Sequence, residues 1–184
     1  VLVNVGLAAG YQAKQAEAHG MSQRGGSVTT FVRWGEVVYS PLVGAGEVDV
    51  LLAFEQVEAL RWLNQLRPGA LALVNLDVVM PLTVTSGTAQ YPDEAKLCAA
   101  VAQVTDRVAF VRGSELAFQL GNARAANVVL LGALSALMER LGDAGPQLSE
   151  DIWLKVITER VPARYIDLNI AAFQAGRRAV LQTV

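Results

Sequence analysis

The residues with the clearest capacity for chemistry lie in one short stretch, 19–26, which reads HGMSQRGG. His19 is the only histidine of the chain, and an unperturbed imidazole titrates near neutral pH, so it is the candidate for proton transfer. Arg24 carries a guanidinium that can bind a phosphate or a carboxylate through two hydrogen bonds. Gly25 and Gly26 leave their backbone amides accessible to an anion. The stretch predicts an anion-binding loop, and a solvent-exposed glycine turn is the alternative.

A second group of polar residues follows three apolar runs that are typical of parallel strands. Glu55 follows the first run, Asn75 lies near the end of the second, and Arg112 with Gly113 follows the third. Open α/β sheets bind ligands beyond the carboxyl ends of their strands, so these residues are candidates for lining a shared crevice. Each of them, taken alone, is also an ordinary helix-capping or edge residue.

Two asparagines lie at the start of a long apolar segment, 124–140. Asn122 is expected to be a helix N-cap. Asn127 is a polar residue on an otherwise apolar surface, and a buried asparagine needs hydrogen-bond partners. We therefore expect Asn127 to fix a loop or to face a partner or ligand. Cys98 is expected to be a small core residue on the apolar face of helix 93–105, together with neighbouring alanines (Ala95, Ala99 and Ala102).

The scarcity of cysteine and histidine excludes several classes of chemistry. The chain has one cysteine and one histidine. A disulfide needs two thiols, an iron–sulfur cluster usually takes about four, and a structural zinc site takes about four ligands of these types or acids. The sequence therefore predicts that any metal or redox cofactor is held by another protein.

The amino-acid composition restricts further the class of protein to which the chain can belong. Of the 184 residues, 53% are hydrophobic and only 17% charged, so a packed core is expected and general disorder is excluded. The net charge of −2 gives no basic excess for binding nucleic acid. The longest apolar stretch, 125–138, is shorter than the roughly 20 residues that a bilayer requires, and the first residues do not resemble a signal peptide. We expect a cytoplasmic protein without a membrane segment, whose apolar surface is a subunit interface.

The elements that must position these residues can be read from hydrophobic spacing. The first residues, 1–9, resemble the end of a helix closed by Gly10, as if a strand and a glycine-rich loop preceded them. Residues 11–18 and 27–34 read as strands, and Gly35-Glu36 predicts a tight turn into a return strand at 37–40, which makes a β-hairpin.

From residue 48 onward, strands and helices alternate. Strands are predicted at 48–54, 70–76 and 108–111, and helices at 56–65, 93–105, 124–140, 149–160 and 163–182. Strand–helix–strand alternation predicts a parallel sheet with right-handed crossovers. The predicted fold class is α/β: a Rossmann-like three-layer domain, 1–141, with a mostly parallel sheet, a β-hairpin excursion and a helical C-terminal extension, 149–184, packing on it.

The run 17–28, EAHGMSQRGGSV, resembles a signature of the gamma-type domain of 2-oxoacid:ferredoxin oxidoreductases. The form E-x-H-G-M-S-Q-R-G-G-x-V is that of the small (beta) subunits of indolepyruvate ferredoxin oxidoreductases. Supporting segments follow in the right order: VDVL at 48–51 and Glu55, the Pro68-Gly69 turn, and NARAAN at 122–127. The similarity covers most of residues 11–141.

This resemblance implies oxidative decarboxylation of an aryl pyruvate to an aryl-acetyl-CoA, with electrons passed to ferredoxin. It implies that thiamine diphosphate, Mg²⁺ and the iron–sulfur clusters are bound by a large (alpha) partner subunit, and that coenzyme A is a co-substrate. The chain would then be an accessory subunit that turns its 19–26 loop toward the shared active site. The resemblance implies contacts with substrate or coenzyme A from Ser22, Gln23, Arg24, Gly25, Gly26, Glu55 and Asn127, with His19 as the only catalytic candidate.

Two other functions remain open from the residues alone. One is an independent Rossmann-like protein that binds a nucleotide through a glycine loop preceding Val1, since no G-x-G-x-x-G fingerprint occurs in the sequence itself. The other is a purely structural subunit whose motif only shapes an interface.

Overall fold

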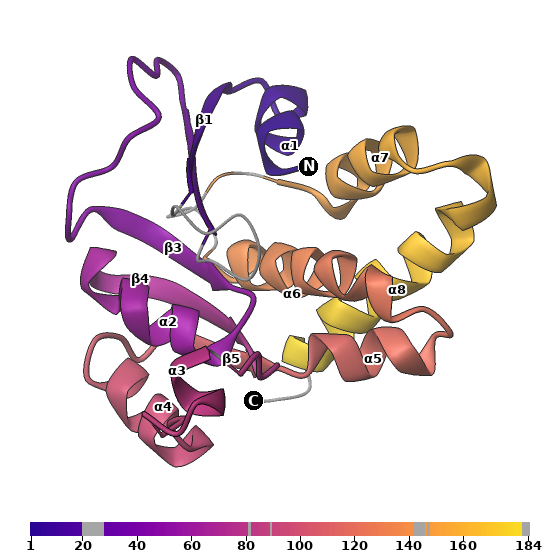
Figure 1. Ribbon diagram of the computed structural model, residues 1–184. Coiled ribbons are helices and arrows are strands. Elements are labelled where there is room, and N and C mark those ends of the chain that lie inside the picture. Colours follow the sequence, from indigo (N-terminus) through magenta and orange to yellow (C-terminus); the bar gives the residue numbers. More distant parts are fainter. Residues whose placement is uncertain (20–27, 81, 89, 142–145, 147, 182–184) are drawn as a thin grey trace.

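In the computed structural model, the described residues are 1–19, 28–80, 82–88, 90–141, 146 and 148–181. A parallel sheet of three strands, in the order β3-β4-β5, forms the centre of the molecule (Figure 1). A separate antiparallel pair, β1-β2, lies beside it. The strands are β1 (Gln12–His19), β2 (Val28–Gly35), β3 (Val48–Ala53), β4 (Leu66–Asn75) and β5 (Val108–Val111).

Helices cover both faces of the parallel sheet (Figure 1). The α-helices are α1 (Leu2–Ala8), α2 (Gln56–Trp62), α3 (Leu82–Thr85), α4 (Glu94–Ala102), α5 (Gly113–Gln119), α6 (Ala126–Glu139), α7 (Glu150–Arg160) and α8 (Ile166–Leu181). Short 3₁₀ turns lie at Leu63–Gln65, Ala123–Ala125 and Ala163–Tyr165. The predicted α/β class, with its parallel sheet, antiparallel hairpin and helical C-terminal region, is confirmed.

The central strand β4 explains why the sheet has a core on each face. Side chains alternate along a strand, so Leu71 and Leu73 point to one face and Ala72 and Val74 to the other. The first pair packs in a cluster with α6 and α8, and the second pair packs in a cluster with α2 and α4. A strand that is buried on both faces is mainly apolar, and for this reason residues 70–76 could be predicted as a strand.

β4 begins earlier than the sequence predicted. It pairs with β3 from Leu66, and the register then shifts, so that the next pair is Val50 with Leu71. Pro68-Gly69 lies within this irregular part of the strand, where Gly69 has a φ of +71°, a conformation that favours glycine. The Pro-Gly signal therefore marks a bulge in the strand, whereas the helix before it ends at Trp62.

The predicted hairpin is formed by different strands from those expected. Strand β2 pairs with β1 along its whole length, from Gln12 opposite Gly35 to His19 opposite Val28. Residues 37–40 form no strand, and Val38 N–H instead donates to Gln12 Oε1 at 3.1 Å. The return strand at 37–40 was wrong because the local turn signal at 35–36 was outweighed by an eight-residue pairing with a distant segment.

Helices α6 and α8 pack against each other at backbone distance within the larger hydrophobic core. A Cβ on Gly132 would lie 1.9 Å from the Phe173 backbone oxygen, and a Cβ on Gly176 would lie 1.8 Å from the Val129 oxygen. Only glycine permits this approach. Arg177 adds polar contacts, because its guanidinium binds Ser135 Oγ at 3.0 Å and Glu139 at 2.7 Å on α6. The C-terminal helix thus shares its core with the sheet, while the domain boundary after residue 141 stays a prediction.

Helix α4 buries a different face from the expected one. Leu97 and Val101 are fully buried, whereas Ala95, Ala99 and Ala102 are exposed and Cys98 is half-buried. Burying larger aliphatic side chains removes more apolar area from water, so the pair Leu97/Val101 determines how the helix is turned. The assignment of Cys98 to the central apolar face was therefore wrong.

Candidate functional site

The carboxyl ends of β3, β4 and β5 lie at one edge of the sheet because the three strands are parallel. The chain continues from these ends into residues 54–56, 76–80 and 112–114. We call the polar side chains at this edge the carboxyl-edge cluster: Glu55, Asn75, Asp77, Tyr91, Arg112 and Ser114. The predicted convergence of Glu55, Asn75 and the Arg112–Gly113 segment at one edge is therefore what the fold produces.

Asn75 is the centre of this edge. It is only 2% exposed, and its Nδ2 donates to the Phe54 carbonyl at 3.1 Å while its Oδ1 accepts from Gly113 N–H at 2.8 Å. It thereby joins the segments that follow β3 and β5. Gly113 suits this position, since a Cβ there would make a tight contact with Asn75 Oδ1 at 3.0 Å. The role of Asn75 is to hold the edge together, and both of its amide atoms are used within the protein.

Glu55 is the N-cap of α2 and is only 9% exposed. Its Oε2 accepts from Val57 N–H at 2.8 Å and Glu58 N–H at 3.0 Å, the usual arrangement that satisfies the first amides of a helix. Its Oε1 accepts from Val79 N–H at 3.4 Å and from the Tyr91 hydroxyl. The carboxylate therefore has four donors from the chain itself, and no acceptor position is left for a substrate.

Tyr91 and Glu55 form the most perturbed pair of the edge. Partial burial raises the pKa of Tyr91, and its hydrogen bond to Glu55 and the charge of that carboxylate raise it further. All three effects favour the neutral phenol, the form that donates a hydrogen bond to Glu55. The pair is thus stable as a charge-assisted hydrogen bond at neutral and mildly alkaline pH.

The segment that follows β4 is held by its neighbours on both sides. Leu76 N–H donates to the Val111 carbonyl at 2.8 Å, and the Leu76 carbonyl accepts from Gln56 Nε2 at 2.9 Å. The Asp77 carbonyl accepts from Gln56 N–H at 3.3 Å, and the Asp77 carboxylate accepts from Ser114 Oγ. Arg112 is more exposed and forms an ion pair with Glu94 at 2.9 Å.

The structure tests the predicted site residues only in part. Ser22, Gln23, Arg24, Gly25 and Gly26 lie outside the described residues. His19 is described for its backbone alone, which ends β1 opposite Val28. The anion-binding loop and the role of His19 therefore stay predictions.

Asn127 and Glu55 are the two predicted contacts that lie within the described residues. Asn127 is exposed in the first turn of α6, so the expectation of a buried asparagine was wrong, because the apolar face of this helix passes through Val128 and Leu131 instead. Asn122 is the N-cap of the 3₁₀ turn before α6, as predicted, and accepts from Arg124 N–H at 3.0 Å.

Sequence reasoning missed Tyr91, Asp77 and Ser114. Asp77 directly follows the predicted strand 70–76, and Ser114 follows Arg112-Gly113, so the rule that selected Asn75 would also have found them. Tyr91 had no such signal, since it lies 36 residues from Glu55 and before a helix whose orientation the sequence did not predict.

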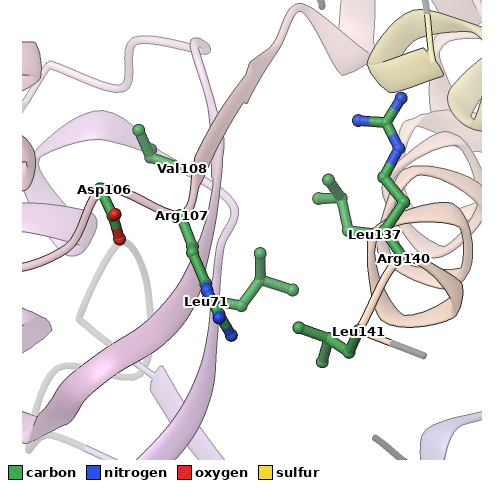
Figure 2. Close-up of a pocket in the computed structure, with 7 residues that line it drawn as sticks. All are labelled: Leu71, Asp106, Arg107, Val108, Leu137, Arg140 and Leu141. Carbon is green, nitrogen blue, oxygen red and sulfur yellow. The ribbon is translucent and has the colours of Figure 1, made fainter. Parts of the chain in front are cut away.

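A cavity of about 340 Å³ lies at the opposite, amino-terminal edge of β5. Leu71 and Arg107 line one side of it, and Leu137, Arg140 and Leu141 line the other (Figure 2). The Arg140 guanidinium points away from that of Arg107, so the two charges do not converge on one point (Figure 2). This cavity is separate from the carboxyl-edge cluster.

Within the described residues, no group of three or more histidine, cysteine, aspartate or glutamate side chains is arranged to hold a metal ion. The same part of the chain contains no helix that is both long and apolar enough to cross a bilayer. A donor set for an iron–sulfur cluster does not fit this chain, whose one thiol is the half-buried Cys98 of α4.

A helix-covered parallel sheet with polar side chains gathered at its carboxyl edge is a common framework for binding and catalysis, and comparison with known proteins defines its class here. The sequence model of the pyruvate ferredoxin/flavodoxin oxidoreductase family matches residues 1–179, and the chain belongs to that family. It is 43% identical over 175 residues to the indolepyruvate oxidoreductase subunit IorB of Thermococcus kodakarensis, with 94% of this chain and 83% of that protein covered.

Solved structures share the fold. The gamma subunit of a keto/oxoacid ferredoxin oxidoreductase from Geobacter sulfurreducens superposes with a TM-score of 0.66 and 26% identity, covering 98% of this chain and 90% of that one. A 2-oxoglutarate:ferredoxin oxidoreductase from Magnetococcus marinus, solved with 2-oxoglutarate, coenzyme A and succinyl-CoA bound, has a TM-score of 0.69 and 18% identity. The superposition includes all of this chain but only 28% of that longer chain. The resemblance drawn from residues 17–28 is confirmed, and the chain is a subunit of an oxidoreductase.

Proposed function

We propose that this chain is the small subunit of a thiamine-dependent, indolepyruvate-type ferredoxin oxidoreductase. The assembled enzyme would convert an aryl pyruvate and coenzyme A to an aryl-acetyl-CoA and CO₂, with the electrons passed to ferredoxin. The observation that carries this proposal is the sequence identity to the archaeal subunit IorB over nearly the whole chain. We further propose that the complex acts in the cytoplasm.

The cofactors are assigned to a large (alpha) partner subunit. Thiamine diphosphate with Mg²⁺ would supply the carbanion chemistry, and iron–sulfur clusters would carry the electrons. The donor set of this chain supports that division, because one cysteine cannot ligate a cluster. The contribution of this chain is then positioning and charge.

Its apolar surface supports docking on such a partner. Four exposed apolar side chains, those of Phe54, Val78, Val79 and Met80, lie beside the carboxyl-edge cluster. Apolar side chains gathered next to a polar cluster are typical of a surface that is covered in an assembly. We therefore propose that the carboxyl edge faces the shared active site.

Within the chain, we assign anion binding to Arg24 and the amides of Gly25 and Gly26. The group bound would be a coenzyme A phosphate or the carboxylate of the oxoacid. Ser22, Gln23 and His19 would add polar contacts. Glu55 has its acceptor positions filled by the protein, so its proposed role is to shape the site.

The proposal is tested by co-expressing the chain with a thiamine- and cluster-binding large subunit and assaying the complex for aryl pyruvate oxidation. Replacing Arg24 by alanine should raise the KM for coenzyme A or for the oxoacid by about tenfold, because a charge-assisted contact is lost. The matched control is Arg61→Ala, which removes an exposed arginine of α2 that pairs with Glu58 three residues earlier. Unchanged KM values for both substrates in Arg24→Ala would refute the assignment, and absence of a complex would refute the subunit role.

A further inference from the structure

The segment 76–80 combines a fixed backbone with three exposed apolar side chains, Val78, Val79 and Met80, which follow the partly buried Leu76. Its amides and carbonyls are bound by Val111, Gln56 and Glu55, as described above. Yet Val79 is 64% exposed, and its neighbours Val78 and Met80 are about half exposed. Burial of these side chains therefore does not hold the segment in place. Hydrogen bonds from buried groups beneath it do.

Glu55 is the group that joins this segment to the rest of the edge. Its Oε2 serves α2 through Val57 and Glu58, and its Oε1 serves Val79 and Tyr91. The bond from Val79 is long, at 3.4 Å. The Tyr91 hydroxyl is thus the strong donor to Oε1, and it fixes the direction in which that oxygen faces Val79.

We propose that Tyr91 is a positioning residue of the assembled enzyme: its hydroxyl orients Glu55, and through Glu55 it holds the backbone at Val79 in the arrangement that the substrate site requires. The inference rests on the proposed function, because it assigns the carboxyl edge to the active-site side. Tyr91 need not contact substrate to act in this way. Its effect is transmitted by one carboxylate to one backbone segment.

The two oxygens of Glu55 have different partners, so an effect on Oε1 can be distinguished from a general loss of stability. Replacing Tyr91 by phenylalanine keeps the ring and removes only the hydroxyl. The cap of α2 on Oε2 remains, so the helix is retained. Oε1 is left with the long bond from Val79 alone, so the restraint on Val79 is weakened, while Asp77 keeps its bonds to Gln56 and Ser114. A preorganised site loses affinity when its support is loosened, even where no contact to the ligand is removed.

The experiment compares wild type and Tyr91→Phe by hydrogen–deuterium exchange and by steady-state kinetics. Exchange is measured in the isolated chain and in the complex with the large subunit. We expect the amide of Val79, which donates to Glu55, to exchange about tenfold faster in the variant, with the amides of α6 unchanged. In the complex, the KM for coenzyme A or the oxoacid should rise about fivefold, with kcat within about twofold of wild type. Tyr165→Phe, a hydroxyl removal at the remote 3₁₀ turn Ala163–Tyr165, is the matched control and should match wild type in both measurements.

The possible outcomes separate this inference from the proposed function. Unchanged exchange at Val79, or unchanged KM values for both substrates in an active complex, overturns the positioning role. A fall in kcat with constant KM also overturns it, because that result reports a smaller active fraction and not a displaced site. If wild type forms no active complex, the proposed function fails, while the exchange comparison in the isolated chain still decides whether Tyr91 restrains the segment.

Discussion

Gly132 and Phe173 lie so close that a side chain on the glycine would occupy the position of a backbone carbonyl: a Cβ would sit 1.9 Å from the Phe173 oxygen. This contact joins α6, which covers the sheet, to α8 near the end of the chain. Because the position of a Cβ is fixed by its own backbone and the Phe173 oxygen is a backbone atom, no side-chain rotation can relieve the clash. The helices would have to move apart.

Gly132→Ala should therefore lower the free energy of unfolding by about 3 kcal/mol or more, the upper part of the range for overpacked cores. Urea unfolding followed by tryptophan fluorescence measures this, since Trp153 packs against Phe173. Gly35→Ala is the control, because its Cβ would make only ordinary contacts, the nearest at 3.5 Å. Equal stabilities of the two variants would contradict the close contact between α6 and α8.

Asn75→Ala should cost about 2–4 kcal/mol of stability. The substitution leaves the buried Gly113 N–H and the partly buried Phe54 carbonyl without their partner, and it opens a gap at the junction of β3, β4 and β5. Thermal unfolding compared with Asn64→Ala, an exposed asparagine, gives the measurement. A cost equal to that of the exposed control would show that Asn75 does not hold the edge together.

The ion pairs of Arg177 lead to a prediction about the stability of the C-terminal region. Its side chain is 11% exposed and binds Glu139 at 2.7 Å and Glu150 at 3.0 Å. Arg177→Met should destabilise the protein by about 2 kcal/mol, less than for a fully buried pair because Glu139 is largely exposed. Chemical denaturation alongside Arg61→Met, which breaks an exposed pair, measures the difference. Similar losses in both would mean that the link between α6, α7 and α8 contributes little.

The raised pKa of Tyr91 predicts how its contribution to stability depends on pH. In the unfolded chain a tyrosine ionises near pH 10, whereas Tyr91 in the folded protein keeps its proton above that pH. The folded state then binds more protons, so the contribution is complete below about pH 10 and is lost as the pH rises further.

The stability advantage of wild type over Tyr91→Phe should accordingly shrink above pH 10, by at most about 1.4 kcal/mol per pH unit. Urea unfolding of both proteins at pH 8, 10 and 11 tests the sign, and the other tyrosines cancel because both proteins contain them. An advantage that grows with pH in this range would exclude a neutral phenol donating to Glu55.

Much of the fold was predictable because the strands of the parallel sheet are mainly apolar. The runs at 50–53, 70–74 and 108–111 have no polar side chain, which is typical of strands covered on both sides. Glu55 as a helix cap and the gathering of polar residues at the carboxyl edge follow from local sequence and from parallel topology. The family was recognisable from the run at 17–28 and the supporting segments that follow it, although the structure of residues 20–27 lies outside the described part.

Other features depended on partners far along the chain. Strand β2 pairs with residues 12–19 and not with 37–40 because of contacts made in the tertiary structure. The same holds for the burial of Leu97 and Val101 on α4. The hydrogen bond between Tyr91 and Glu55 is of the same kind. Periodicity in a sequence reports that an element has an apolar side. It carries no information on which distant segment will cover that side, because the pairing is set by shape, volume and hydrogen bonds that only the tertiary structure brings together.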